Sequence, residues 1–238
     1  MRRLMLAAIL GVLAAGRAEA GYVITDDFNR ADSSTLGPGW TTRNPGLGIV
    51  GGQAATTRDE ALSTYNGPSQ SAVEIDVFTN QGRGVQYAAI VLKYTDVGNN
   101  IFIKVQSQGS SPSFGNYAIY YGNDGLFSPA GIFGTLETPF TSGKIRATLT
   151  GDTATLQVDP GFTGTFTQSY SYTFSALQVA ALGSGVGIGA YGGASIDNFA
   201  IGTPDAIATP EPASLASTAS GLVALGLYGY RRSRRKAA

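Results

Sequence analysis

The stretch that decides the fold is KIRATLTGDTATLQV, residues 144–158. Apolar and polar side chains alternate on both sides of Gly151-Asp152, a pair of residues that favours a tight turn. Because successive side chains of a strand point to opposite faces, this alternation predicts two strands that are each half-buried. The stretch therefore predicts an antiparallel pair of strands with one wet face.

Segments of the same kind recur throughout residues 21–202, separated by turn residues such as those at 96–99 and 122–125. Glycine supplies 33 of the 238 residues, about twice its usual share. The sequence shows helical character only at 175–182, where we expect a short helix. We therefore predict one all-β domain over 21–202, an antiparallel β-sandwich or barrel. Its strands are expected at 22–25, 72–79, 85–94, 100–106, 117–121, 144–149, 153–158, 165–174 and 195–201.

The composition excludes several kinds of chemistry. The chain has no histidine and no cysteine, so it offers no Ser-His-Asp triad, no thiol nucleophile, no disulfide and no ordinary zinc site. Its formal net charge of zero conceals basic ends, because 14 acidic side chains outnumber 8 basic ones between residues 21 and 209. This acidic body disfavours binding to nucleic acid.

The first 20 residues are predicted to be a secretory signal peptide. Arg2 and Arg3 precede an apolar run over 4–15, and Ala18-Glu19-Ala20 forms a small-residue cleavage site before Gly21. This order is typical of such peptides, and the apolar run is too short to span a bilayer.

The C-terminal end is predicted to be a sorting signal over 210–238, joined to the body by a linker over 203–209. Pro210-Glu211-Pro212 precedes an apolar segment over 213–230, which is long enough for a weak transmembrane helix. A basic tail follows over 231–236, and its positive charges favour a cytoplasmic end. The basic residues of that tail are Arg231, Arg232, Arg234, Arg235 and Lys236.

This order of features resembles the PEP-CTERM sorting domain of Gram-negative bacteria. The resemblance implies export and recognition of Pro210, Glu211 and Pro212 by an exosortase, a membrane-embedded enzyme that cuts near this motif. The helix would then be a transient anchor. A permanent tail anchor is the alternative, since a span followed by basic residues fits both.

The body resembles concanavalin A-like or LamG-like jelly-roll domains. The resemblance rests on the segments 26–32 and 36–40 near its start and on Ser195-Ile196-Asp197-Asn198-Phe199 near its end. It implies that the first and last segments form neighbouring strands that close the sandwich. Since members of that family bind glycans, bind proteins or hydrolyse polysaccharides, function has to be argued from sites.

Glu74-Ile75-Asp76 resembles the E-x-D core of the laminarinase-like glucanases with this fold. That resemblance implies a pair of catalytic carboxylates, but the family's second glutamate is absent, since Phe78 and Thr79 follow. An alternating strand with a wet face produces the same pattern, and we favour that interpretation. A glycoside hydrolase that takes its acid/base from Glu60 or Glu137 is kept as the alternative.

Two groups of aromatic residues are candidates for stacking on sugars. Phe166, Tyr170, Tyr172 and Phe174 share one face of a predicted strand, which we expect to point into the sandwich. Tyr117, Tyr120 and Tyr121 cannot all be buried by one alternating strand. We therefore expect at least one of these three to face solvent and to be a ligand contact.

Oxygen-bearing side chains in the turns could in principle hold calcium, which prefers oxygen ligands. They are also ordinary turn formers, and we favour that interpretation, with no metal site and no cofactor. The residues concerned are Asp96, Asn99, Asn100, Asn123 and Asp124.

Together these observations predict an exported, non-enzymatic jelly-roll protein of the cell surface or extracellular matrix. A role in binding extracellular polysaccharide is its most specific version, and a structural or adhesive role is the alternative.

Overall fold

A computed structural model describes residues 22–43, 45–56, 60–68, 70–109, 111–123 and 126–202, with the side chains of 123 and 126–129 left aside. The predicted signal peptide, linker, sorting motif, membrane helix and basic tail lie outside these residues. Within them, no helix is both long and apolar enough to cross a membrane. Contacts divide the chain into two compact units, 1–204 and 205–238, and the described body belongs to the first.

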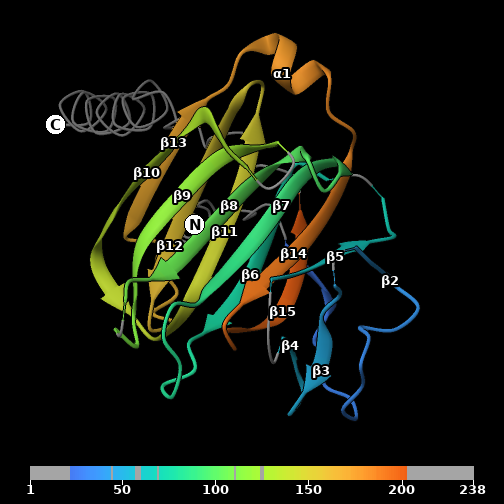
Figure 1. Ribbon diagram of the computed structural model, residues 1–238, viewed down its shortest axis with the longest axis vertical. Coiled ribbons are helices and arrows are strands. Elements are labelled where there is room, and N and C mark those ends of the chain that lie inside the picture. The colour runs from blue at the N-terminus through green and yellow to red at the C-terminus, as the bar shows by residue number, and fades with distance from the viewer. Residues whose placement is uncertain are drawn as a thin grey trace, which may run out of the picture. The chain divides into compact units, whose positions relative to one another are not determined.

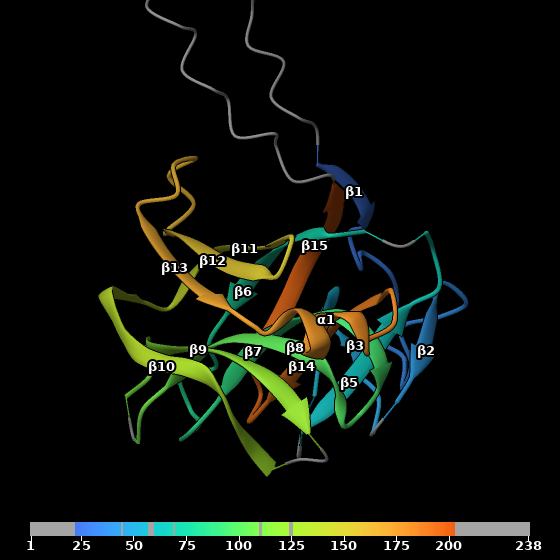
Figure 2. The same ribbon diagram turned by 90° about the horizontal axis from the view of Figure 1, so that it is seen from above.

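The body is built from two antiparallel sheets packed face to face (Figures 1 and 2). The eight-stranded sheet has the order β13-β12-β11-β6-β15-β4-β3, and β1 pairs with β15 beside this path. Its strands are β1 (Val23–Asp26), β3 (Gly48–Val50), β4 (Gln53–Ala55), β6 (Ala72–Phe78), β11 (Ser142–Thr150), β12 (Thr153–Pro160), β13 (Gln168–Thr173) and β15 (Ser195–Gly202).

The seven-stranded sheet has the order β10-β9-β8-β7-β14-β5-β2. Its strands are β2 (Trp40–Thr42), β5 (Ala61–Tyr65), β7 (Tyr87–Asp96), β8 (Asn99–Ser107), β9 (Phe114–Asn123), β10 (Leu126–Phe140) and β14 (Gly185–Tyr191). One short helix, α1 (Ala176–Ala180), connects β13 to β14, and Ser175 caps it with a capping box to Gln178. The predictions of an all-β antiparallel sandwich and of a helix near 175–182 are confirmed.

The core lies between the sheets and follows the predicted alternation. Val73, Ile75 and Val77 of β6 are fully buried there, and so are Ile145 and Leu156 of the neighbouring strands. Glu74 and Asp76 lie on the other side of β6, the outer face of the sheet. Because a strand turns alternate side chains to opposite faces, the buried valines and isoleucine determine where both carboxylates point.

The two ends of the body close the sandwich, as the jelly-roll resemblance implies. β1 pairs with β15, with Val23 opposite Ile201. Beside this pair the Asp26 carboxylate accepts hydrogen bonds from the Arg30 guanidinium at 2.7 and 3.0 Å and from the Trp40 indole N–H at 2.7 Å. Trp40 packs against Phe199, with ring centroids 4.8 Å apart. Residues from both predicted motifs thus meet at one corner of the core.

The prediction for 165–174 is wrong in part. β13 begins only at Gln168, so Phe166 precedes the strand. Tyr170 and Tyr172 pack against the core and Phe174 is buried in it, as expected. The Phe166 ring instead lies on the outer face of the sheet, over the Arg146 guanidinium at 4.2 Å. The turn that follows Pro160 redirects the chain, so strand alternation does not extend back to Phe166.

Candidate functional site

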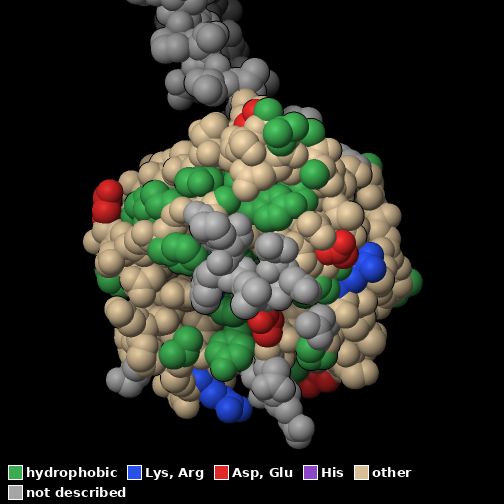
Figure 3. All heavy atoms as spheres, turned by 45° about the horizontal axis from the view of Figure 1, so that its top comes forward, with side chains coloured by type: hydrophobic (Ala, Val, Ile, Leu, Met, Phe, Trp, Pro, Cys, Tyr) green, Lys and Arg blue, Asp and Glu red, His purple; other side chains and the backbone are tan. Residues whose placement is uncertain are grey.

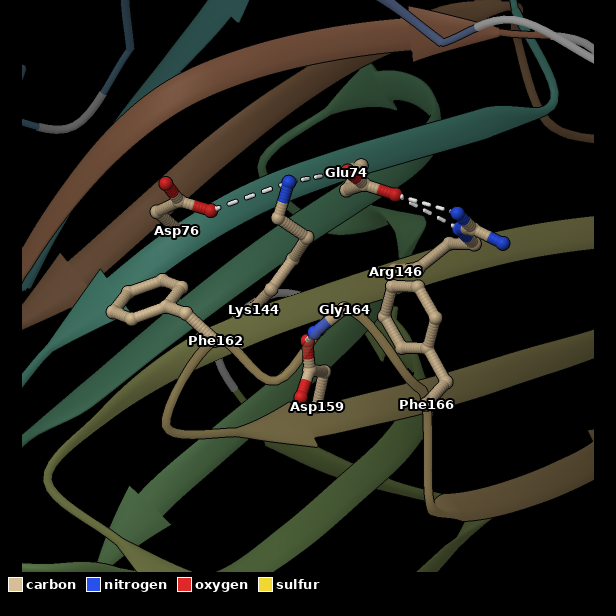
Figure 4. A pocket seen from close by; sticks show the side chains of 8 residues that line it. All are labelled: Glu74, Asp76, Lys144, Arg146, Asp159, Phe162, Gly164 and Phe166. Carbon is tan, nitrogen blue, oxygen red and sulfur yellow. Dashed lines mark hydrogen bonds and ion pairs between the residues drawn. The ribbon is translucent and has the colours of Figure 1, made fainter.

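A hollow of about 470 Å³ lies on the outer face of the eight-stranded sheet (Figure 4). β6 and β11 supply four of its charged groups, β12 supplies Asp159, and the connection between β12 and β13 supplies its rings. Its lining residues are Glu74, Asp76, Lys144, Arg146, Asp159, Phe162, Gly164 and Phe166. The hollow therefore combines charge with aromatic surface, as small-molecule sites commonly do.

The Glu74 carboxylate is bonded to two cationic side chains. Its Oε1 accepts a hydrogen bond from Lys144 Nζ at 2.7 Å, and its Oε2 accepts two from Arg146, from Nε at 2.9 Å and from Nη2 at 2.8 Å. The β6–β11 register places Arg146 directly opposite Glu74. Both oxygens of this 7% exposed residue are therefore engaged by positive charge.

Asp76 shares one of these cations. Its Oδ1 lies 3.6 Å from Lys144 Nζ, and its Oδ2 accepts a hydrogen bond from Asn198 Nδ2 at 2.8 Å. Among the described residues, Asp76 Oδ1 is a buried atom without a hydrogen-bond partner. Figure 4 shows the Lys144 ammonium between the two carboxylates. The sequence motif thus forms a salt-bridge network in the folded chain.

The pKa of Lys144 reflects this position. Burial, the largest influence, lowers the pKa, but the Glu74 hydrogen bond and the charges of Glu74 and Asp76 outweigh it. The pKa is therefore raised above its usual value, and the ammonium is charged at neutral pH.

Arg146 contacts two aromatic rings as well as Glu74. Its guanidinium lies 4.4 Å from the ring centroid of Tyr22 and 4.2 Å from that of Phe166. A planar guanidinium stacks favourably on aromatic faces. With Glu74 bonded to its edge, Arg146 has little freedom to move.

The loop that carries the rings is anchored by Asp159. The Asp159 carboxylate accepts hydrogen bonds from the Thr163 N–H at 2.9 Å, the Thr163 hydroxyl at 2.6 Å and the Gly164 N–H at 2.8 Å. Phe162, which is 40% exposed, leans on Phe78, with ring centroids 5.5 Å apart. The loop thus presents the two phenylalanine rings on opposite sides of Lys144 (Figure 4).

The three candidate tyrosines of β9 separate between the two faces of their sheet. Tyr117 lies in the core and stacks on Tyr170 at 3.8 Å between ring centroids. Tyr121 also packs against the core, and its hydroxyl donates to Asn99 Oδ1 at 3.1 Å. Tyr120 lies on the outer face of the seven-stranded sheet. Of the three, only Tyr120 is therefore placed to contact a ligand on that face.

Tyr120 belongs to a row of five rings that crosses five neighbouring strands, which we call the aromatic band. From β14 to β10, consecutive ring centroids are separated by 5.7, 5.9, 5.4 and 5.8 Å. Phe133 at one end is 49% exposed, and Tyr120 and Tyr191 are half-buried. The band consists of Tyr191, Tyr87, Phe102, Tyr120 and Phe133. Figure 3 shows several separate hydrophobic patches on the face it presents, where charged side chains are few and scattered.

One glycine and one lysine lie against the rings of the aromatic band. A Cβ atom at Gly189 would lie 3.4 Å from the Phe102 ring, so the bare backbone lets that ring lie close to the sheet. Lys104 lies between two rings of the band, 4.8 Å from the Tyr87 centroid and 5.8 Å from that of Tyr120. Burial lowers the pKa of Lys104, and the nearby Glu60 charge opposes this shift. A few charged groups thus accompany a mainly apolar surface.

The two acid/base candidates lie away from Glu74. Glu60 precedes β5 and acts electrostatically on Tyr87, Lys104 and Tyr120 of the seven-stranded sheet. Glu137 lies on β10 of the same sheet. Neither lines the hollow that contains Glu74 and Asp76.

The calcium candidates that the structure describes are engaged within a turn. The Asp96 carboxylate accepts hydrogen bonds from the Gly98 N–H and the Asn99 amide, and the Asn100 amide donates to backbone carbonyls of Asp96 and Val97. Asp124 and the side chain of Asn123 lie outside the described residues. Over the described part of the chain, no group of three or more acidic, histidine or cysteine residues is arranged to hold a metal ion.

Several residues of these two surfaces were not predicted from the sequence. Phe133 lies on β10, a strand that was not predicted, although Ile132 and Phe133 next to Gly134 were a weak signal. Tyr87 and Phe102 were assigned to strands but not to a common face. Arg146 and Lys144 stood on the polar side of the predicted hairpin, and nothing local identified Glu74 as their partner.

Solved structures share this architecture. The carbohydrate-binding module CBM66 from Bacillus subtilis matches with a TM-score of 0.50 and 16% identity over 69% of this chain and 94% of its own. Rv0315 of Mycobacterium tuberculosis is described as an immunostimulatory antigen and pseudo β-1,3-glucanase. It matches with a TM-score of 0.53 and 11% identity over 77% of this chain and 100% of its own. The exoplasmic/lumenal domain of VIP36, in a Ca²⁺/Man2-bound form, matches with a TM-score of 0.51 and 11% identity over 78% of this chain and 89% of its own.

The fold is a concanavalin A-like β-sandwich. At these identities the likeness concerns the fold and leaves function to the sites. No protein-family model matches the chain, and no curated protein sequence matches it. The predicted resemblance of the body to concanavalin A-like domains is confirmed at the level of the fold.

Proposed function

We propose that the sandwich is a non-enzymatic glycan-binding domain whose ligand stacks on the Tyr120–Phe133 end of the aromatic band. The observation that carries this proposal is the continuous contact of five rings across five strands. Tyr87 and Phe102 of the band are buried, whereas Phe133 at its end is exposed at a position where folding by itself does not require an aromatic ring. Pyranose rings have an apolar C–H face that packs flat against an aromatic ring.

The exposed end of the band is the expected point of contact. Phe133 and Tyr120 are stacked, with their planes 21° apart, and Phe133 is 49% exposed. Lys104 and Glu60 are the nearby charged groups, and such groups orient a ligand on a mainly apolar surface. Similar folds in a carbohydrate-binding module and in a mannose-bound domain support this chemistry.

The absence of catalysis is part of the proposal. Glu74 has both oxygens bonded to cations, and Lys144 also faces Asp76. A retaining glycosidase needs one carboxylic acid that can give up a proton and one carboxylate that can attack the sugar. A carboxylate held by Lys144 and Arg146 is poorly suited to either task.

Binding can be measured on residues 21–202, which contain both closing strands. The wild-type body is compared with Phe133→Ala on a broad panel of polysaccharides by affinity electrophoresis. We expect at least one neutral polysaccharide to bind the wild type, and about tenfold weaker binding by the variant, the upper range for one aromatic contact. Leu177→Ala, at an 84% exposed position on α1, is the control. Absence of binding across the panel, or equal binding by Phe133→Ala, would contradict the proposal.

We also propose that the chain is exported and sorted through its ends. The signal-peptide pattern of residues 1–20 and the order of Pro210-Glu211-Pro212, apolar segment and basic tail support this. An exosortase-type enzyme and the export machinery would be its partners, and the envelope, cell surface or extracellular matrix of a Gram-negative bacterium its destination. There a glycan-binding domain would meet extracellular polysaccharide.

A further inference from the structure

We propose that the hollow on the eight-stranded sheet is a second saccharide site, which takes one or two neutral sugar units. It lies on the outer face of the sheet opposite the one that carries the aromatic band. The proposal goes beyond the function proposed above, because it requires no binding at Tyr120 or Phe133.

The charged floor of the hollow is more elaborate than the sheet requires. On the neighbouring pair β12–β13, the outer face is made of hydroxyl pairs, such as Thr155 with Ser171 at 2.9 Å. On β6–β11 the corresponding positions hold Glu74 and Arg146, both largely buried. Removing charges from water costs free energy, and even a well-paired buried network is often no more stabilising than neutral side chains of similar size. Stability of the sheet therefore does not explain this network. It does provide donors and acceptors in a fixed arrangement.

Lys144 and Asp76 form the part of this floor whose hydrogen-bonding capacity is not fully used. Lys144 Nζ and Asp76 Oδ1 are 3.6 Å apart, too far for a direct hydrogen bond. Asp76 Oδ1 has no hydrogen-bond partner among the described residues. A sugar hydroxyl placed against both would accept from the ammonium and donate to the carboxylate, after a small shift of the 32% exposed Lys144 side chain.

The rings supply the second element of recognition. Phe162 and Phe166 stand on opposite sides of Lys144 (Figure 4), on a loop that Asp159 braces with three hydrogen bonds. Phe162 is exposed at the mouth, and Phe166 is held against Arg146. An aromatic wall beside a paired cation and carboxylate offers both stacking and hydroxyl recognition.

The charge and size of the hollow limit the ligand class. Three carboxylates, of Glu74, Asp76 and Asp159, line it against the two cations of Lys144 and Arg146. This balance disfavours an anionic sugar, because both cations are already paired. The volume of about 470 Å³ lies at the lower end of small-ligand pockets. One or two neutral sugar units fit this volume, whereas a long chain would have to extend out of it.

Sites on opposite sheets would let one domain hold two glycan chains. With one chain on the aromatic band and another entering the hollow, the protein would cross-link polysaccharide. Linked binding of this kind strengthens attachment to a matrix without any new contact.

The test uses amide NMR spectra of ¹⁵N-labelled residues 21–202, with the Gly164 N–H as the reporter. Cello-, laminari-, malto- and manno-oligosaccharides are added as neutral probes and oligogalacturonates as anionic ones, each to about 10 mM, so that weak affinities are detected. We expect at least one of these neutral probes to shift Gly164 in the wild type. Phe162→Ala and Asp76→Asn are each expected to weaken that response about tenfold or more, while Leu177→Ala leaves it unchanged. The dispersion of each spectrum reports whether the variant is folded.

Three outcomes would overturn the proposal: no response of Gly164 to any neutral probe, a response only to oligogalacturonates, or an undiminished response in folded Phe162→Ala and Asp76→Asn. The Phe133→Ala variant separates this site from the aromatic band. If Phe133→Ala keeps the Gly164 response, the hollow binds on its own. If it loses that response, the hollow is not an independent site and the inference fails, whatever happens to binding at the band.

Discussion

Glu74 and Arg146 face each other across β6 and β11, and the guanidinium donates two hydrogen bonds, of 2.9 and 2.8 Å, to one carboxylate oxygen. The other oxygen of Glu74 accepts a hydrogen bond from Lys144, which lies on β11 with Arg146. An acidic motif that resembles a glucanase core is therefore engaged by cations that lie 70 and 72 residues further along the chain. Its chemistry is decided by the partner strand.

Glu74→Gln is expected to destabilise the body by about 2 kcal/mol, because it leaves two partly buried cations without their shared counter-charge. Urea unfolding followed by circular dichroism measures this. Glu137→Gln, at an exposed position on β10, should change the unfolding free energy by less than about 0.5 kcal/mol. Equal effects of the two changes would contradict the stabilising role of the Glu74 network.

The wild-type body is expected to release no new reducing ends from β-1,3- or β-1,4-glucans. The reason is that both oxygens of Glu74 are bonded to cations, so the motif lacks the pair of an acid and a nucleophile that the mechanism needs. A reducing-sugar assay over a broad pH range tests this, with Glu74→Gln as the matched control. Activity that is present in the wild type and lost in Glu74→Gln would establish the hydrolase alternative.

Trp40→Phe is expected to cost about 2 kcal/mol, since it removes a hydrogen bond to a charged, partly buried acceptor. The indole N–H donates to Asp26 Oδ2 at 2.7 Å, and Phe cannot replace this donor. Tyr65→Phe, which keeps the neighbouring ring beside Trp40, is the comparison. The urea midpoints of both variants measure the difference, and a shift no larger in Trp40→Phe than in Tyr65→Phe would contradict the assignment.

Asp26 and Asp197 are expected to affect stability with opposite dependence on pH. Burial, the largest single influence on Asp26, raises its pKa, but hydrogen bonds from Arg30, the Phe28 N–H and Trp40 together hold the pKa below its usual value. Burial raises the pKa of Asp197, and the charges of Asp76 and Asp27 add to this against the Asn198 N–H bond.

The stabilisation from Asp26 is present above the unfolded-state pKa of about 4 and is lost as the pH falls through the lower folded-state pKa. The deficit of Asp26→Asn relative to wild type should therefore shrink on acidification. The Asp197 carboxylate binds its proton more tightly when folded, so the wild type gains stability relative to Asp197→Asn as the pH falls through that raised pKa. Unfolding free energies between neutral pH and about pH 3 measure both differences, and parallel trends would contradict the prediction.

Replacing Glu211 with Ala, or deleting 231–238, is expected to leave unprocessed protein in the membrane fraction of the native host. The reason is that both changes remove features that the sorting resemblance requires. Immunoblotting of fractionated cells measures the size and location of the protein. Normal processing of both variants would contradict the sorting resemblance.

Much of the fold was accessible from local pattern. Alternation around Gly151-Asp152 predicted β11 and β12, and Ser175 with Gln178 marks the start of α1. These features are local, because side-chain alternation and capping depend on residues close together in the chain. The same alternation placed Glu74 and Asp76 on the wet face of their strand.

Strands without clear alternation were not predicted. β5 contains small or polar residues at positions that the sheet buries, such as Ser63 and Thr64, and neither β5 nor β10 alternates clearly. The strand structure of β5 comes from neighbours on both sides, since it pairs with β14 and β2, whereas β10 is an edge strand that pairs with β9. Local preference for a strand is weak, and packing against a sheet overrides it.

By itself, the sequence determined the class of fold, the absence of histidine and thiol chemistry, the acidic body and the alternation of each clear strand. The tertiary structure decided which strands are neighbours. The order and register of the strands place Lys144 and Arg146 beside Glu74 and align rings from five strands into one band. They also decide that Tyr120 faces outward while Tyr117 lies in the core. The physical reason is that alternation separates the two faces of one strand, whereas contact between residues far apart in the chain depends on strand order and register.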